Sequence, residues 1–172
     1  MTAFAASVII ISESERSNPM KTIIRDQFAE LTTALENFVK ENFDEDYEVT
    51  MGADFYVDLG TDVIYYSIIC PEADEKSFCA DFINRFPACA DISPLMLSLM
   101  HEVGHLEEEW QMIDDTAERE LCTKSEDYYK LFNERIATDY AGEWLTEHHD
   151  FAKECDKKFI AIYEKILDKI LD

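Results

Sequence analysis

The sequence predicts an α+β fold in which an N-terminal helix and a small three-stranded sheet are followed by further helices. Three observations support this prediction. Apolar side chains recur at helical spacing over residues 21–42. Three short runs rich in Val, Ile and Tyr follow, and Gly52 and Gly60 supply turns between them. Helical patterns punctuated by proline fill the remainder of the 172-residue chain.

The first helix is expected to begin near Met20 and to extend to Asn42. Its apolar stripe consists of Ile24, Phe28, Leu31, Leu35, Phe38 and Val39. Residues 1–19 contain a short apolar run and a polar break, and an edge strand, a flexible arm and an upstream extension all remain open. The run is too short to span a bilayer and lacks the basic region of a signal peptide. Residues 20–172 are expected to form a single domain.

The remaining elements follow from strand composition and from helix start and stop signals. Strands are expected over residues 47–51, 54–59 and 62–69, and helices over residues 72–86, 94–112, 125–147 and 151–171. Pro71 and Pro87 bound the first of these helices. Ser93 and Pro94 supply a cap and a first turn for the second.

The charge of the chain limits its partners. It carries 38 acidic and 15 basic residues, a formal net charge of −23. Such a surface repels phosphate, so neither direct nucleic-acid binding nor membrane binding is expected. A solvated acidic coat is the simple interpretation, and capture of a basic partner or imitation of nucleic acid is the alternative. Five cysteines without a C-x-x-C pair favour free thiols and a cytoplasmic location.

Residues 101–105 read His-Glu-Val-Gly-His within the expected helix at 94–112. This spacing places His101 and His105 one above the other on one helix face, so both can reach one zinc ion. Glu102 lies beside them, where it can take a proton from a zinc-bound water and pass it to a leaving amine. The motif also arises by chance in acidic chains. An apolar stripe on the opposite face favours metal ligands, and it comprises Leu95, Met96, Leu99, Val103, Leu106 and Trp110.

Gly104 lies inside the same motif. Glycine within a helix costs about 1 kcal/mol relative to alanine and is usually retained where another backbone comes close. We therefore expect a sheet strand or a bound peptide to approach Gly104, with simple tolerance of glycine as the alternative.

A catalytic zinc needs a third protein ligand. A histidine six residues after His105 would serve, but Gln111 occupies that position. The remaining option is a carboxylate on a later helix, and Glu134 is the best candidate because it shares an arc with small and apolar residues. Those residues are Leu131, Ala137, Thr138, Ala141, Trp144 and Leu145. A metal would offset the cost of burying this carboxylate, whereas an exposed glutamate is the alternative.

The two segments together resemble the ImmA/IrrE family of zinc metallopeptidases. That family pairs H-E-x-G-H with a later helix that reads roughly E-x-x-A-N/D-x-F-A-x-x-L-L, and residues 134–145 correspond to it here. The resemblance implies a zincin-like minimal metallopeptidase domain that binds Zn²⁺ through His101, His105 and Glu134. It also implies that Glu102 is the catalytic residue.

The chain departs from the family pattern at Thr138, which replaces Asn or Asp, and at Tyr140, which replaces Phe. Acidic residues 107–109 follow the second histidine, where the family often has apolar ones. The resemblance implies hydrolysis of a protein or peptide substrate, with a regulator or repressor of a bacterial or mobile-element system as the typical target. A non-catalytic zincin-fold protein that captures a basic partner is the alternative. The oligomeric state is left open.

The group that stabilises the oxyanion is also open, because several hydrogen-bond donors lie near the motifs. Tyr128, Tyr129, Tyr140 and His148 are candidates. His148 lies on the order of 20 Å along the helix from Glu134, so a surface position is the better expectation for it.

Overall fold

The structure is a computed structural model and describes residues 19–52, 54–67, 72–122 and 125–171. The arm or extension expected at residues 1–19 falls outside the described residues except for Pro19, which begins the first helix. The described residues have the expected α+β organisation, with one small sheet near the N-terminus and helices after it.

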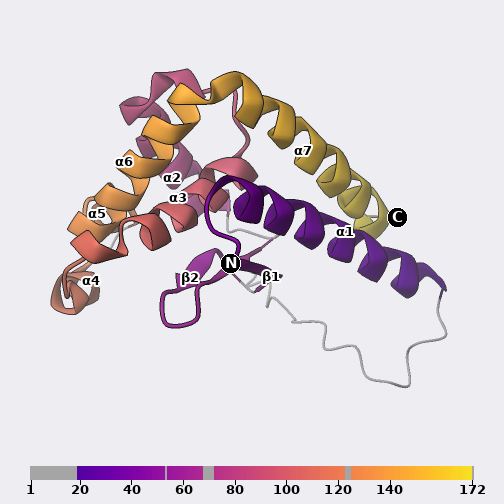
Figure 1. The fold of residues 1–172 in the computed structure, drawn as a ribbon, viewed down its shortest axis with the longest axis horizontal. Helices are drawn as coiled ribbons and strands as arrows, with labels where there is room; N and C mark the ends of the chain where they lie inside the picture. The colour runs from indigo at the N-terminus through magenta and orange to yellow at the C-terminus, as the bar shows by residue number, and fades with distance from the viewer. Residues whose placement is uncertain (1–18, 53, 68–71, 123–124, 172) are drawn as a thin grey trace.

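Two long helices, α1 (Pro19–Asn42) and α7 (His149–Leu171), lie side by side (Figure 1). The stripe predicted for α1 is buried along its described part, at Leu31, Leu35, Phe38 and Val39. The ring of Phe38 meets that of Phe159 on α7 edge-on, with 5.7 Å between the centroids. This packing joins the two ends of the described chain.

Three short strands form one mixed sheet in the order β1-β3-β2. They are β1 (Glu48–Met51), β2 (Tyr56–Asp58) and β3 (Val63–Tyr66), each shorter than its expected range. β1 runs parallel to β3 and β2 antiparallel to it, so that Ile64 pairs with Val49 on one side and Val57 on the other. β1 packs against α1, and the edge strand β2 packs against the helix that carries the histidine motif.

The helices after the sheet are grouped around one pair, α3 (Pro94–Glu107) and α6 (Phe132–Glu147). The flanking elements are α2 (Glu72–Arg85), the 3₁₀ turns η2 (Pro87–Cys89) and η3 (Glu109–Gln111), α4 (Thr116–Leu121) and α5 (Ser125–Tyr128) (Figure 1). As predicted, Ser93 caps α3, since its Oγ accepts a hydrogen bond from the main-chain N of Met96 at 3.3 Å.

Four sequence expectations for this region are wrong. The helix expected over 94–112 ends at Glu107, and residues 109–111 form the separate 3₁₀ turn η3. Trp110 therefore leaves the apolar stripe and is 80% exposed. The helix expected over 125–147 is interrupted where Leu131 adopts an extended conformation, with ψ of 151°. α4 was not expected at all.

Within the described part of the chain, no helix is both long and apolar enough to cross a bilayer. None of the four cysteines that the structure describes forms a disulfide.

Candidate metal centre

The site depends on an unusually close approach between α3 and α6. A Cβ atom added at Gly104 would lie 2.3 Å from the main-chain oxygen of Ala137, closer than real Cβ contacts come. The expected close approach at Gly104 is therefore present, but the approaching backbone belongs to α6 rather than to a strand or a peptide. Because Ala137 lies one turn after Glu134, this contact brings Glu134 opposite His101.

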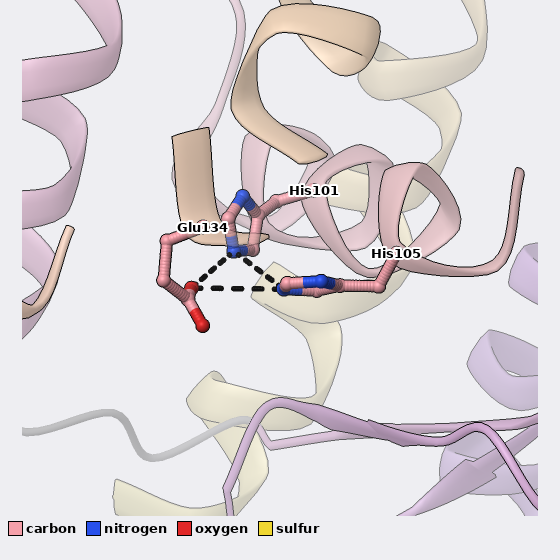
Figure 2. Close-up of side chains that lie close together, drawn as sticks. All are labelled: His101, His105 and Glu134. Carbon is pink, nitrogen blue, oxygen red and sulfur yellow. Dashed lines mark hydrogen bonds and ion pairs between the residues drawn. The ribbon is translucent and has the colours of Figure 1, made fainter. Parts of the chain in front are cut away.

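His101, His105 and Glu134 point toward one another from these two helices (Figure 2). His101 Nε2 lies 3.0 Å from Glu134 Oε2 and 3.2 Å from His105 Nε2, and the third side of the triangle, from His105 Nε2 to Glu134 Oε2, is 3.6 Å. A tetrahedral ion with bonds of 2.0–2.1 Å holds its ligand atoms about 3.3–3.4 Å apart. The three buried side chains therefore form a group that fits one metal ion of this size.

The electrostatics of the group favour a bound cation. Burial alone would raise the pKa of the Glu134 carboxyl, but hydrogen bonds from both imidazoles hold it well below its usual range. Burial lowers the pKa of His105, which favours its neutral form. Burial opposes a charge on His101 too, yet the Glu134 carboxylate raises the pKa of that imidazole. An ionised carboxylate beside two imidazoles attracts either a proton or a metal ion into the space between them.

Thr138 fixes the orientation of the His101 ring. Its Oγ1 donates to the main-chain oxygen of Glu134 at 2.8 Å and lies 3.1 Å from His101 Nδ1. Because the hydroxyl hydrogen is used on the carbonyl, Oγ1 accepts a hydrogen bond from Nδ1–H. Nε2 is then the nitrogen directed at Glu134 and His105, as a metal ligand requires. Phe78 packs edge-on against the same ring, with 5.2 Å between centroids.

Glu102 lies next to the group without belonging to it. Its side chain is buried, and burial raises its pKa to about 7, with the charge of His101 opposing this shift and that of Glu134 adding to it. A carboxyl group that titrates near neutral pH can both accept and return a proton.

Sequence reasoning missed Arg119 of α4. Its Nη2 lies 2.8 Å from Glu134 Oε1, its Nε donates to Asp115 Oδ1 at 2.6 Å, and its Nη1 donates to the Tyr128 hydroxyl. The four-residue spacing of Asp115 and Arg119 is typical of a helical ion pair and was the available signal. Nothing in that spacing indicates that the pair lies beside Glu134.

Of the proposed oxyanion donors, Tyr128 hydrogen-bonds to Glu134 and to Arg119. Burial raises the pKa of its hydroxyl, and the nearby charge of Glu134 adds to the shift. Tyr140 instead donates to Glu107 at 3.3 Å, and Tyr129 packs against Phe78 with 5.4 Å between centroids. His148 is exposed, in agreement with its expected surface position.

No family model matches the chain, and no match was found among curated proteins or solved structures. The geometry of the site and the sequence motifs therefore carry the functional proposal.

Proposed function

We propose that this protein is a zinc-dependent metallopeptidase, with His101, His105 and Glu134 as metal ligands and Glu102 as general base. The triangle of 3.0, 3.2 and 3.6 Å between the three ligand atoms carries the proposal. Within the described residues this group offers three ligands rather than four. Three protein ligands are typical of catalytic zinc, which keeps one position open, whereas structural zinc usually has four.

The chain supplies the proton transfers of peptide hydrolysis. A zinc ion contributes Lewis acidity toward the scissile carbonyl and toward water when it is bound. Glu102 accepts a proton from the attacking water and returns it to the leaving amine, a role that suits a carboxyl with a pKa of about 7. The Tyr128 hydroxyl accepts a hydrogen bond from Arg119 and donates one to Glu134, so it would turn away from Glu134 to donate to a developing oxyanion.

The resemblance of the two motifs to the ImmA/IrrE family supports the proposed peptidase function. Thr138 stands where the family has Asn or Asp, and its hydroxyl contacts His101, so the residue at this position supplies a polar partner for the first ligand here. The proposed substrate is a protein or peptide, such as a bacterial or mobile-element regulator, and the proposed location is the cytoplasm. The net charge of −23 supports one alternative, a non-catalytic protein of similar fold that captures a basic partner.

Comparison of wild type with Glu102→Gln separates these functions. The variant retains the shape of the side chain but loses its basic oxygen, so we expect zinc to stay bound while proteolysis of unfolded casein falls about 10²–10⁴-fold. Zinc content and casein cleavage are measured on the same preparations. Glu143→Gln, which changes an exposed carboxylate on α6, is the matched control and should cleave like wild type.

Equal cleavage by wild type and Glu102→Gln would exclude the general-base role. Zinc-loaded wild type that binds a basic protein without cleaving it or casein would favour the non-catalytic alternative.

A further inference from the structure

The two carboxylate oxygens of Glu134 have different partners, and Arg119 is the partner of one of them. Oε2 faces the imidazoles, at 3.0 Å from His101 Nε2, whereas Oε1 lies 2.8 Å from Arg119 Nη2. The metal group includes one oxygen of this carboxylate, and the other is already held by a cation.

The guanidinium is itself fixed from three sides. Nη2 contacts Glu134, Nε contacts Asp115 and Nη1 contacts the Tyr128 hydroxyl, so each nitrogen has a different partner. Its carbon atom also lies 5.0 Å from the centroid of the Tyr128 ring. A lysine ammonium is a single point charge and cannot span three partners in this way.

The two carboxylates that Arg119 contacts are buried, whereas its own side chain is one-third exposed. Glu134 is 2% exposed and Asp115 is 6% exposed, so neither carboxylate has water as a substitute partner. Within the described residues, Asp115 Oδ2 has no hydrogen-bond partner, and Arg119 is the cation that compensates the charge of Asp115. Removing the guanidinium would leave the buried carboxylates of Glu134 and Asp115 without its compensating positive charge, which lowers the stability of the folded protein.

We infer that Arg119 is a positioning residue that restricts Glu134 to ligation through one oxygen and thereby keeps a coordination position open for substrate and water. This inference rests on the proposed metal centre. Without the guanidinium, Oε1 has no cation except the metal, and Glu134 turns both oxygens to it. The added oxygen then occupies the space that a catalytic site leaves free.

The test uses Co²⁺ in place of zinc, because the visible absorption of Co²⁺ is stronger with four ligands than with five or six. We expect wild type to show the strong four-coordinate bands and Arg119→Ala to lose intensity. On casein, kcat of the zinc-loaded variant should fall about 10–100-fold with little change in KM, as for other residues that orient a ligand. Arg135→Ala removes an exposed arginine next to Glu134 and should match wild type in both measurements.

If Arg119→Ala does not fold, as judged by circular dichroism, Arg119→Gln is measured, because its amide is uncharged but fills most of the same space. A wild-type Co²⁺ spectrum in the folded variant overturns the inference, whatever its activity. Failure of wild type to bind Co²⁺ or Zn²⁺ is a separate result, and it overturns the metal centre together with the inference.

Discussion

At the scale of single residues, Gly104 sets the distance between the two helices that carry the ligands. Gly104→Ala would push a methyl group into the backbone at Ala137, so α6 must move away from α3. We expect the free energy of unfolding to fall by about 1–3 kcal/mol. Urea denaturation measures this change.

Gly60→Ala is the control for this substitution, because the nearest atom to its added Cβ would be a side-chain oxygen of Asp58 at 3.4 Å. Gly60→Ala should change the free energy of unfolding by no more than about 0.5 kcal/mol. Equal stabilities of the two variants would show that the helices do not depend on a glycine at position 104.

Thr138→Val removes the hydroxyl that orients His101 while keeping the volume of the side chain. We expect zinc affinity to fall about 10–100-fold, as is typical when the hydrogen-bond partner of a metal ligand is lost. Competition with a chromophoric chelator measures the affinity. Thr146→Val is the matched control, since Thr146 likewise donates to a main-chain oxygen of α6, that of Gly142 at 2.7 Å, without contacting a ligand. A zinc affinity of Thr138→Val equal to that of Thr146→Val would contradict the orienting role.

Residue spacing predicted the ligand candidates, because helical periodicity places His101 and His105 on one face and Glu134 among small residues. It could not predict Arg119, because that contact depends on how α4 folds back toward α6. It also misassigned the partner of Gly104, since a glycine inside a helix indicates that another backbone comes close without saying which one.

At the scale of elements, Asp156 ties α7 to the start of α3. Its Oδ2 accepts a hydrogen bond from the Ser93 main-chain N at 2.9 Å, and its Oδ1 accepts one from the Ser93 hydroxyl. Burial raises the pKa of Asp156 above the ordinary 3.8, so the folded protein takes up its proton more readily than the unfolded chain. This contribution to stability is therefore largest at low pH and is lost as pH rises through the raised pKa.

We expect Asp156→Asn to remove this loss of stability at higher pH, because an amide does not titrate. The amide can still accept a hydrogen bond from the Ser93 main-chain N–H and donate one to the Ser93 hydroxyl. Asp156→Ala, which breaks both hydrogen bonds, should cost about 1–3 kcal/mol. Unfolding is followed in urea from pH 4 upward, and the difference between wild type and Asp156→Asn isolates this group from the other acidic residues. A difference that does not vary with pH would contradict the assignment.

Most elements follow from the sequence, whereas the break between α5 and α6 does not. Proline and glycine are absent from residues 125–141, so the local pattern predicts a continuous helix. In the structure, the side chain of Asn133 binds the main chain of Ile113 through two hydrogen bonds, of 3.0 and 2.8 Å. Such a tertiary contact at the first turn of α6 has no periodic signature, which explains why the helix start was misplaced.

At the scale of the whole molecule, the apolar core is built without the three proposed metal ligands. It extends from α1 through the sheet to α3 and α7, with buried residues such as Leu35, Ile64, Leu99 and Ile166. A core of this extent is sufficient for a domain of this size. We therefore expect the chelator EDTA to abolish casein cleavage while leaving the far-ultraviolet circular dichroism spectrum almost unchanged. Unfolding on chelation would instead indicate a structural zinc.

A calorimetric titration of the metal-free protein with Zn²⁺ shows directly whether His101, His105 and Glu134 form one metal centre. We predict one zinc per chain for wild type and for His148→Ala, which changes an exposed histidine, and no binding at this site for His105→Ala. A folded wild-type protein that binds no zinc, or a His105→Ala variant that binds it as tightly as wild type, would show that these three residues do not form a metal centre.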